Sequence, residues 1–234
     1  MGNRKKAVTI GTYILVFLCF IGITYAASIA TTTVAQLIPL ERNATIVIDP
    51  GHGGIDGGAT SCSGQLESQY NLEIALKLDD LLHLLGYQTK TIRRTDISVY
   101  TSGETIAAKK VSDLRQRVRL VNETKNAILL SIHQNTFSDG KYHGAQVFYG
   151  PKGESRELAA LLQEAFRETL NPDSQRQSKK AEGIYLMQHI NCTGVLVECG
   201  FLSNPVEEAK LRSAEYQRKI CCILASVTGQ FLTK

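Results

Sequence analysis

The residues best suited to chemistry in this sequence are two histidines and two glutamates: His52, Glu67, His133 and Glu198. Imidazole and carboxylate groups bind divalent metals and exchange protons near neutral pH. Two histidines and one carboxylate form a ligand set of catalytic zinc that leaves a fourth position open. A further carboxylate nearby is what a zinc hydrolase needs as its general base. The four residues therefore indicate a metal-dependent hydrolase, provided that the fold brings them together.

Each of these residues also has a simpler interpretation. His52 lies in the glycine-rich stretch Gly51–Gly58, which can be a tight turn with a solvated imidazole. An acid such as Glu67 in a first helical turn complements the helix dipole. The glycines do not form a phosphate-binding loop, since no Lys follows them, and Asp56 occupies the third glycine position of a dinucleotide-binding fingerprint. The other histidines lack a regularly spaced acidic partner, and we expect them not to bind metal: His83, His143 and His189.

The elements that must position the four residues alternate between strands and helices. Strand patterns occur at residues 45–48, 87–92, 127–132, 144–149 and 194–197. Helical periodicity and capping patterns predict helices at residues 66–85, 112–124, 154–170, 205 onward and 213–232. We therefore predict an α/β fold, a three-layer αβα sandwich around one twisted, largely parallel sheet. His52, His133 and Glu198 then share the carboxyl edge of the sheet, where open α/β sheets place their sites.

The first forty residues differ from the rest of the chain. Arg4, Lys5 and Lys6 precede residues 7–40, which contain no Asp, Glu, Lys or Arg. The apolar residues 7–30 are numerous enough to cross a bilayer of about 30 Å as a helix, and the charges before them predict a cytoplasmic N-terminus. We expect residues 1–30 to be an uncleaved membrane anchor. A cleaved signal segment is the alternative, because small residues near Ser28 offer a peptidase site.

The rest of the chain is predicted to be a short tether and one domain. The tether comprises residues 31–43, and residues 44–234 are enough for a substantial core. Without the three basic residues near the N-terminus, 23 basic residues face 22 acidic ones, which argues against nucleic acid as a partner. The six cysteines include no C-x-x-C pair, so a zinc finger is disfavoured, and we expect most of them to be small buried hydrophobic residues.

Four blocks of the sequence resemble the signature motifs of zinc-dependent N-acetylmuramoyl-L-alanine amidases, the amidase-3 family. In chain order these blocks are Asp49–Gly54, Glu67, Ser131–Asn135 and Leu196–Asn204. The likeness extends from about Thr45 to Leu232. It implies that His52, Glu67 and His133 are zinc ligands and that Glu198 is the catalytic acid/base. Arg94–Asp96 and Leu114–Asn122 also match family positions, which we interpret as structural.

The resemblance implies hydrolysis of the amide bond between N-acetylmuramic acid and L-alanine in peptidoglycan, with Zn²⁺ as the cofactor. The membrane segment, the single domain and residues 104–122 are similar to the germination-specific, CwlD-type branch of the family, which acts on spore cortex so that muramic lactam can form. The N-terminal segment predicts an extracytoplasmic protein, membrane-anchored or secreted. Family members often carry separate wall-binding modules, and the predicted domain of about 190 residues leaves no room for one, so we expect help from an accessory protein or from confinement at the membrane. The alternatives are a zinc peptidase of related fold that cuts stem peptides, and a membrane-tethered wall-binding protein without catalysis.

Overall fold

The computed structural model describes residues 17–25 and 43–234 of the chain. Residues 17–25 are helical, and the domain belongs to a separate compact unit, Glu41–Lys234. Within the described ranges, no helix is both long and apolar enough to span a bilayer. Most of the predicted anchor and nearly all of the predicted tether lie outside the described residues, at positions 1–16 and 26–42.

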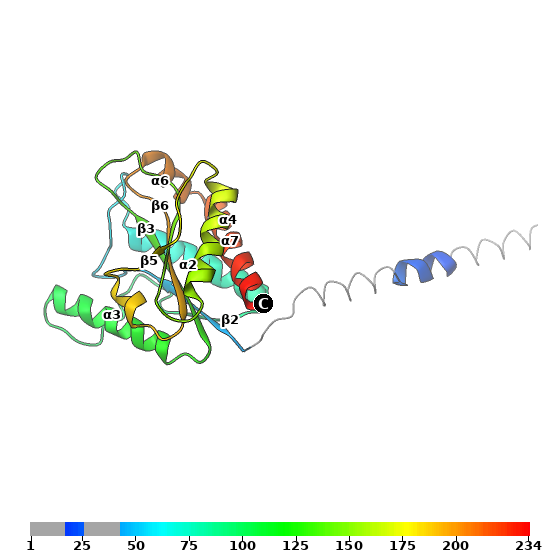
Figure 1. Cartoon of the computed structure of the whole chain (residues 1–234), viewed down its shortest axis with the longest axis horizontal. Helices are drawn as coiled ribbons and strands as arrows, with labels where there is room; N and C mark the ends of the chain where they lie inside the picture. The colour runs from blue at the N-terminus through cyan, green and yellow to red at the C-terminus, as the bar shows by residue number, and fades with distance from the viewer. Residues whose placement is uncertain (1–16, 26–42) are drawn as a thin grey trace, which may run out of the picture. The chain divides into compact units, whose positions relative to one another are not determined.

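A six-stranded sheet, in the order β2-β1-β3-β6-β4-β5, forms the centre of the domain (Figure 1). Its strands are β1 (Thr45–Pro50), β2 (Gln88–Thr91), β3 (Ala127–Asn135), β4 (Gln146–Tyr149), β5 (Lys179–Lys180) and β6 (Thr193–Phe201). The strands β2, β1, β3 and β6 are parallel, as predicted. In contrast, β4 is antiparallel to β6 and pairs in parallel with β5.

The sheet is therefore largely parallel, as expected, but it is mixed, because β4 and β5 run opposite to the other strands, which the sequence did not predict. The connection from β3 to β4, residues 136–145, contains no helix. A parallel return requires a crossover of about a dozen or more residues, usually helical. The short connection therefore brings β4 back in the opposite direction, beside β6.

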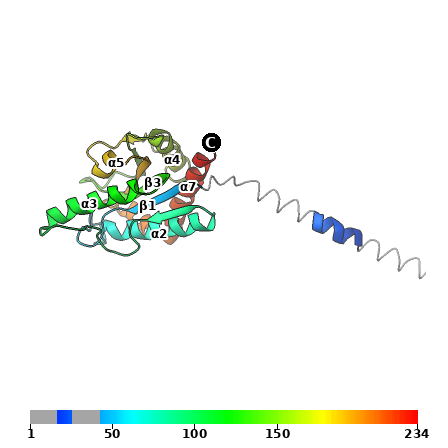
Figure 2. The same ribbon diagram turned by 90° about the horizontal axis from the view of Figure 1, so that it is seen from below.

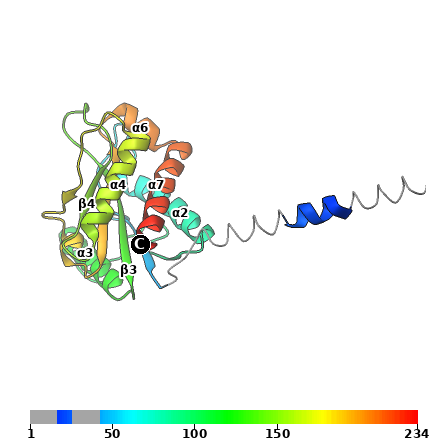
Figure 3. The same ribbon diagram turned by 45° about the vertical axis from the view of Figure 1, so that its right-hand side comes forward.

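Helices cover both faces of the sheet. The helices are α2 (Glu67–Leu84), α3 (Ile106–Asn122), α4 (Ser155–Leu170), α5 (Tyr185–His189), α6 (Pro205–Leu211) and α7 (Ala214–Leu232). Figure 3 shows α4, α7 and α2 side by side, whereas α3 lies across β1 from α2 in Figure 2. Alternate residues of one strand face different cores: Ile46 and Ile48 pack with α2, α4 and α7, and Val47 packs with α3 and α5. Strands buried on both faces explain the continuous apolar runs of the sequence.

Helix α3 begins earlier than predicted. Thr105 is its N-cap, and the hydroxyl of Thr105 accepts a hydrogen bond from the N–H of Ala108. Ser112 and Asp113, at the start of the predicted helix 112–124, lie inside α3 and accept hydrogen bonds from backbone N–H groups of the preceding loop. The first turns of α3 bury almost no side chain, so they carry no apolar stripe that would reveal them in the sequence.

The other predicted elements are confirmed to within a few residues at each end. The cap predicted for α6 is also confirmed, because Oδ1 of Asn204 accepts hydrogen bonds from the N–H groups of Val206 and Glu207. Two short elements, β5 and α5, were not predicted. Their few residues carry too little periodicity to be recognised.

Candidate metal centre and active site

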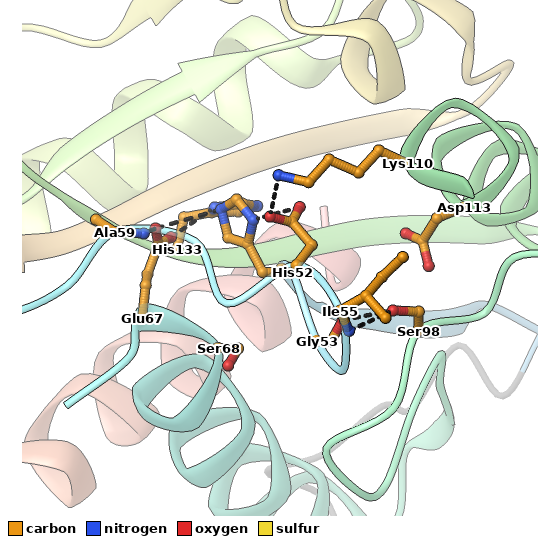
Figure 4. A network of polar contacts seen from close by, with 12 residues as sticks. His52, Gly53, Ile55, Ala59, Glu67, Ser68, Ser98, Lys110, Asp113 and His133 are labelled. Carbon is orange, nitrogen blue, oxygen red and sulfur yellow. Dashed lines mark hydrogen bonds and ion pairs between the residues drawn. The ribbon is translucent and has the colours of Figure 1, made fainter. Parts of the chain in front are cut away.

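His52, Glu67 and His133 converge at the carboxyl edge of the parallel strands (Figure 4). His52 follows β1, Glu67 opens α2, and His133 lies within β3. Nε2 of His52 is 3.2 Å from Oε2 of Glu67, and Nδ1 of His133 is 2.9 Å from Oε1 of the same carboxylate. One potential ligand atom from each residue lies within 4.8 Å of the others. The fold thus brings together three of the four residues that the sequence singled out.

The carboxylate of Glu67 is held from several sides. Its Oε2 accepts a hydrogen bond from the N–H of Ala59 at 3.0 Å. Its Oε1 accepts from the N–H of Gln134 and from Nδ2 of Asn71, each at 3.2 Å. The side chain is buried. These bonds fix both oxygens before any ligand arrives.

Asp56 and Lys110 orient the imidazole of His52 from the side of its Nδ1 atom, away from Glu67. Nδ1 of His52 is 2.9 Å from Oδ2 of Asp56, and Nζ of Lys110 is 2.7 Å from Oδ1 of Asp56. Figure 4 shows Lys110 reaching this carboxylate from α3. A carboxylate in this position fixes the tautomer and the ring orientation of a metal-binding histidine. No sequence pattern points to Asp56 or Lys110 in this role, since the two residues meet only in the tertiary structure.

Two buried arginines bind the backbone of the loop that carries His52. Arg93 donates hydrogen bonds to the carbonyl oxygens of Pro50 and Gly51, each at 2.9 Å. Arg117 donates to the carbonyl oxygens of Pro50 at 2.9 Å and His52 at 2.6 Å. Arg117 also forms a buried ion pair with Asp49. Burial alone would raise the pKa of Asp49, but the adjacent Arg117 holds it below its ordinary value.

The structure distinguishes between two adjacent arginines. We had matched Arg94 to the family pattern, but the side chain of Arg94 is 58% exposed and pairs with Asp79. Its neighbour Arg93 is only 2% exposed and makes the contacts to the loop. The structural role expected of Arg117 is confirmed. Arg93 and Arg117 are therefore the two arginines that support the loop carrying His52.

The loop backbone approaches the side chains of the candidate metal centre so closely that only glycine fits at some of its positions. A Cβ atom added to Gly51 would lie 2.1 Å from Nε2 of His133. At Gly58, with a φ of 70°, an added Cβ would lie 2.6 Å from Oε2 of Glu67. His52 itself has a φ of 60°, an uncommon conformation for a residue other than glycine. Such a conformation persists only where the surroundings enforce it, as the two arginines do here.

Glu198 lies beside the three clustered residues without joining them. It is opposite His133 in the register of β3 and β6. A cavity of about 310 Å³ is lined by Glu198 together with His52, His133 and apolar side chains from residues 184–196. Within residues 43–234, no hydrogen-bond partner reaches the buried Oε2 of Glu198. Burial raises the pKa of Glu198 to about 7.

The cluster fits a divalent cation. A zinc ion holds imidazole nitrogens and carboxylate oxygens about 2.0–2.2 Å away, so the donor atoms must gather as these do. Burial opposes a charged imidazole at His52, yet hydrogen bonds and charge from Glu67 and then Asp56 raise its pKa to about 9. Burial likewise opposes a charged Glu67, but hydrogen bonds from His133 and His52 hold its pKa well below the ordinary value. Positive charge is therefore favoured where the three side chains meet.

The remaining histidines lie outside this cluster, as predicted. Among the described residues, the one group with a metal-binding arrangement is the His52–Glu67–His133 set. His83 lies 3.6 Å from a carboxylate oxygen of Asp79 on the exposed side of α2, and Nδ1 of His189 is 2.8 Å from the carbonyl oxygen of Tyr185. His143 lines a different cavity.

Fold and site together define an α/β protein with a candidate metal centre beside a buried, unpaired carboxylate. Residues 46–226 match the amidase-3 model, described as N-acetylmuramoyl-L-alanine amidase. The chain therefore belongs to the amidase-3 family.

Individual relatives agree with this assignment. The chain is 39% identical over 177 residues to the germination-specific N-acetylmuramoyl-L-alanine amidase of Bacillus subtilis, covering 75% of this chain and 74% of that protein. It is 27% identical to the amidase LytC of the same species, of which the match covers 36%. The CwlD amidase from Clostridioides difficile, solved in complex with the GerS lipoprotein, superposes with a TM-score of 0.78 at 35% identity, over 82% of this chain and 99% of that one.

The contacts of Arg93 predict that Arg93→Lys will destabilise the loop. An ammonium group lacks the planar fork that reaches several carbonyl oxygens, so we expect a loss of about 2–3 kcal/mol in the free energy of unfolding. Amide hydrogen exchange within residues 51–58 should also become faster. Arg94→Lys is the matched control, and it should change the free energy by about 0.5 kcal/mol or less. Denaturant unfolding and hydrogen exchange measure both, and equal effects in the two variants would refute this role of Arg93.

Proposed function

We propose that this protein hydrolyses the amide bond between N-acetylmuramic acid and L-alanine in peptidoglycan and releases stem peptides. The observation that carries the proposal is the meeting of His52, Glu67 and His133 beside the unpaired carboxylate of Glu198. The family match over residues 46–226 supports the same reaction. This reaction is also the one implied by the sequence motifs.

His52, Glu67 and His133 are the residues that would hold a zinc ion. Zinc in such a site supplies a Lewis acid that polarises the scissile carbonyl group and makes water more acidic. Asp56 and the amide groups around Glu67 keep the three side chains in place.

Glu198 serves as the general acid and base. Its free Oε2 is in position to take a proton from the attacking water and to return it to the leaving amine of L-alanine. A pKa near 7 suits a group that must do both at neutral pH. The separate surroundings of Glu67 and Glu198 thus assign two roles to two carboxylates.

The proposed biological setting is the spore cortex. The Bacillus subtilis relative is described as germination-specific, and the match covers about three quarters of each chain. In that setting, removal of stem peptides would prepare muramic acid for lactam formation. The Clostridioides difficile relative was solved with a lipoprotein, which supports an accessory protein as a partner of this chain as well.

Mass analysis of digested peptidoglycan tests the proposed reaction against its alternatives. Purified protein should release free stem peptides that begin with L-alanine and leave glycan strands with bare lactyl groups. A zinc peptidase would instead release shortened peptides and leave L-alanine on the glycan. A wall-binding protein without catalysis would release nothing. Either of the last two results would rule out the amidase.

Replacement of each glutamate separates the ligand from the acid/base. Glu198→Gln keeps the shape of the side chain but removes the basic carboxylate, so amidase activity should fall by about 10²–10⁴-fold while zinc is retained. Glu67→Ala, His52→Ala and His133→Ala should each lose zinc and activity, because two protein ligands are too few for a stable site.

Zinc content and amide cleavage are measured on the same preparations of these variants. His83→Ala, from the exposed side of α2, is the control and should change neither quantity. If Glu198→Gln lost its zinc and Glu67→Ala kept it, Glu198 would be the metal ligand and Glu67 the general acid/base.

We also propose that residues 7–30 anchor the domain, residues 44–234, on the outer side of a membrane. The support is the uncharged apolar sequence of residues 7–30 after three basic residues. Full-length protein expressed in a bacterium should sediment with membranes, whereas a chain without residues 1–30 should stay in the supernatant. Fractionation followed by N-terminal sequencing measures this. A mature N-terminus near Ser28 on protein released from the membrane would favour the cleaved signal segment.

A further inference from the structure

A second cavity, here named the Arg176 groove, adjoins the catalytic site on the antiparallel side of the sheet. It has a volume of about 270 Å³, and its lining includes Asn135, Phe137, Phe148, Arg176, Lys179 and Phe201. None of these residues lines the cavity that contains Glu198. No step of the proposed reaction uses the groove.

The strand register places the groove next to Glu198. Gln146 on β4 is opposite Glu198 on β6, and neighbouring strands lie about 4.8 Å apart. Phe148 is opposite Leu196, which lines the catalytic cavity, and Lys179 on β5 is opposite Phe148. Residues paired in this way point to the same face of a sheet. Lys179 therefore lies on the face of the sheet that carries Glu198.

The groove contains two cations without a counter-anion. The guanidinium carbon of Arg176 lies 5.0 Å from the ring centroid of Phe201. Nε of Arg176 donates to the carbonyl oxygen of His143 at 3.2 Å, and Nη1 lies 3.5 Å from Oε1 of Gln146. Lys179 is exposed, and among the ion pairs of residues 43–234 none includes Arg176 or Lys179. Arg176 is thus half-buried and held by neutral groups.

This arrangement selects a ligand with a negative charge. A guanidinium group that is already fixed in place loses little entropy when it binds a planar carboxylate. No acidic side chain lines the groove itself; Arg176 and Lys179 also line an adjoining cavity that includes Asp173, but neither is ion-paired with it. The exposed rings of Phe137 and Tyr142, with centroids 4.8 Å apart, offer apolar surface beside the cations.

We infer that Arg176 and Lys179 form a subsite for a carboxylate of the stem peptide, an acidic peptide that extends from the scissile amide. The inference rests on the proposed amidase function. An extended peptide advances about 3.3–3.6 Å per residue, so a carboxylate two or three residues beyond the scissile bond reaches about one to two strand spacings from Glu198. The N-acetylated sugars on the other side of the bond carry no charge for these cations to bind.

Peptide binding tests the subsite independently of catalysis. The probes are a synthetic stem tripeptide with free carboxylates and its fully amidated counterpart, titrated into the full-length protein by calorimetry. The acidic peptide should bind more tightly, and added salt should reduce the difference. Arg176→Gln and Lys179→Gln should each weaken binding of the acidic peptide by about tenfold, which corresponds to about 1.4 kcal/mol. Neither variant should change the affinity for the amidated peptide.

The matched control is Lys180→Gln, because Lys180 is opposite Tyr149 in the register and points to the other face of the two-residue strand β5. It removes the same charge from the same strand and should leave both affinities unchanged. Arg176→Lys, which keeps the charge and loses the planar fork, should bind the acidic peptide with intermediate affinity. Thermal unfolding confirms that each variant is folded.

Several results would overturn the subsite. The subsite is ruled out if the wild-type protein binds the acidic and amidated peptides with equal affinity. It is also ruled out if Lys179→Gln and Lys180→Gln weaken binding of the acidic peptide equally. A loss of affinity for an uncharged glycan oligomer in Arg176→Gln, with the peptide affinity unchanged, would assign the groove to the sugar. Failure of the proposed function gives a different result: the protein would bind the acidic peptide as described but would release no stem peptide from peptidoglycan.

Discussion

The hydrogen bonds from two buried guanidinium groups to the backbone at residues 50–52 are the constraint on which the site depends. A glycine-rich loop has few side chains to pack and loses much conformational freedom when it becomes ordered. Arg93 and Arg117 offset that cost by binding the carbonyl groups that the turn leaves without partners in the sheet. Asp49 balances the charge of Arg117 in the interior. The end of β1, the loop and α3 are thereby joined, and the imidazole of His52 has a defined position.

The two glutamates at the site show how surroundings separate residues of one type. Glu67 receives hydrogen bonds from backbone amides and lies against two imidazoles, so the ionised form is favoured. Glu198 is partly buried as a residue but has a buried oxygen without a partner, and its pKa rises toward neutrality. The first environment suits a metal ligand and the second a proton carrier. Distance alone would not distinguish them, because both lie near His133.

The change from parallel to antiparallel pairing divides the edge of the sheet into two regions. Strands β1, β3 and β6 bring two of the proposed metal ligands, His52 and His133, close to Glu198, since parallel strands end at the same edge. Beyond β6, the reversed strands β4 and β5 place Phe148 and Lys179 on the same face, and Arg176 lies in the segment just before β5. The parallel half thus holds the reacting groups, and the antiparallel half offers the surface for the proposed carboxylate subsite. Helix α3 closes the opposite side of the catalytic cavity through Lys110 and Leu114.

The sequence by itself indicated the four candidate site residues, and it determined the order of the main strands and helices and the family, because each depends on residue types and spacings within short contiguous segments. Only the tertiary structure decided the antiparallel edge, since the register of β4 against β6 joins segments about fifty residues apart and no local pattern encodes it. It also decided that Arg93 rather than Arg94 supports the loop, because two adjacent arginines differ only in which one faces the interior. Lys110 meets Asp56 and Arg176 meets Phe201 for the same reason: contacts between residues distant in the chain arise from packing, which local sequence patterns do not specify.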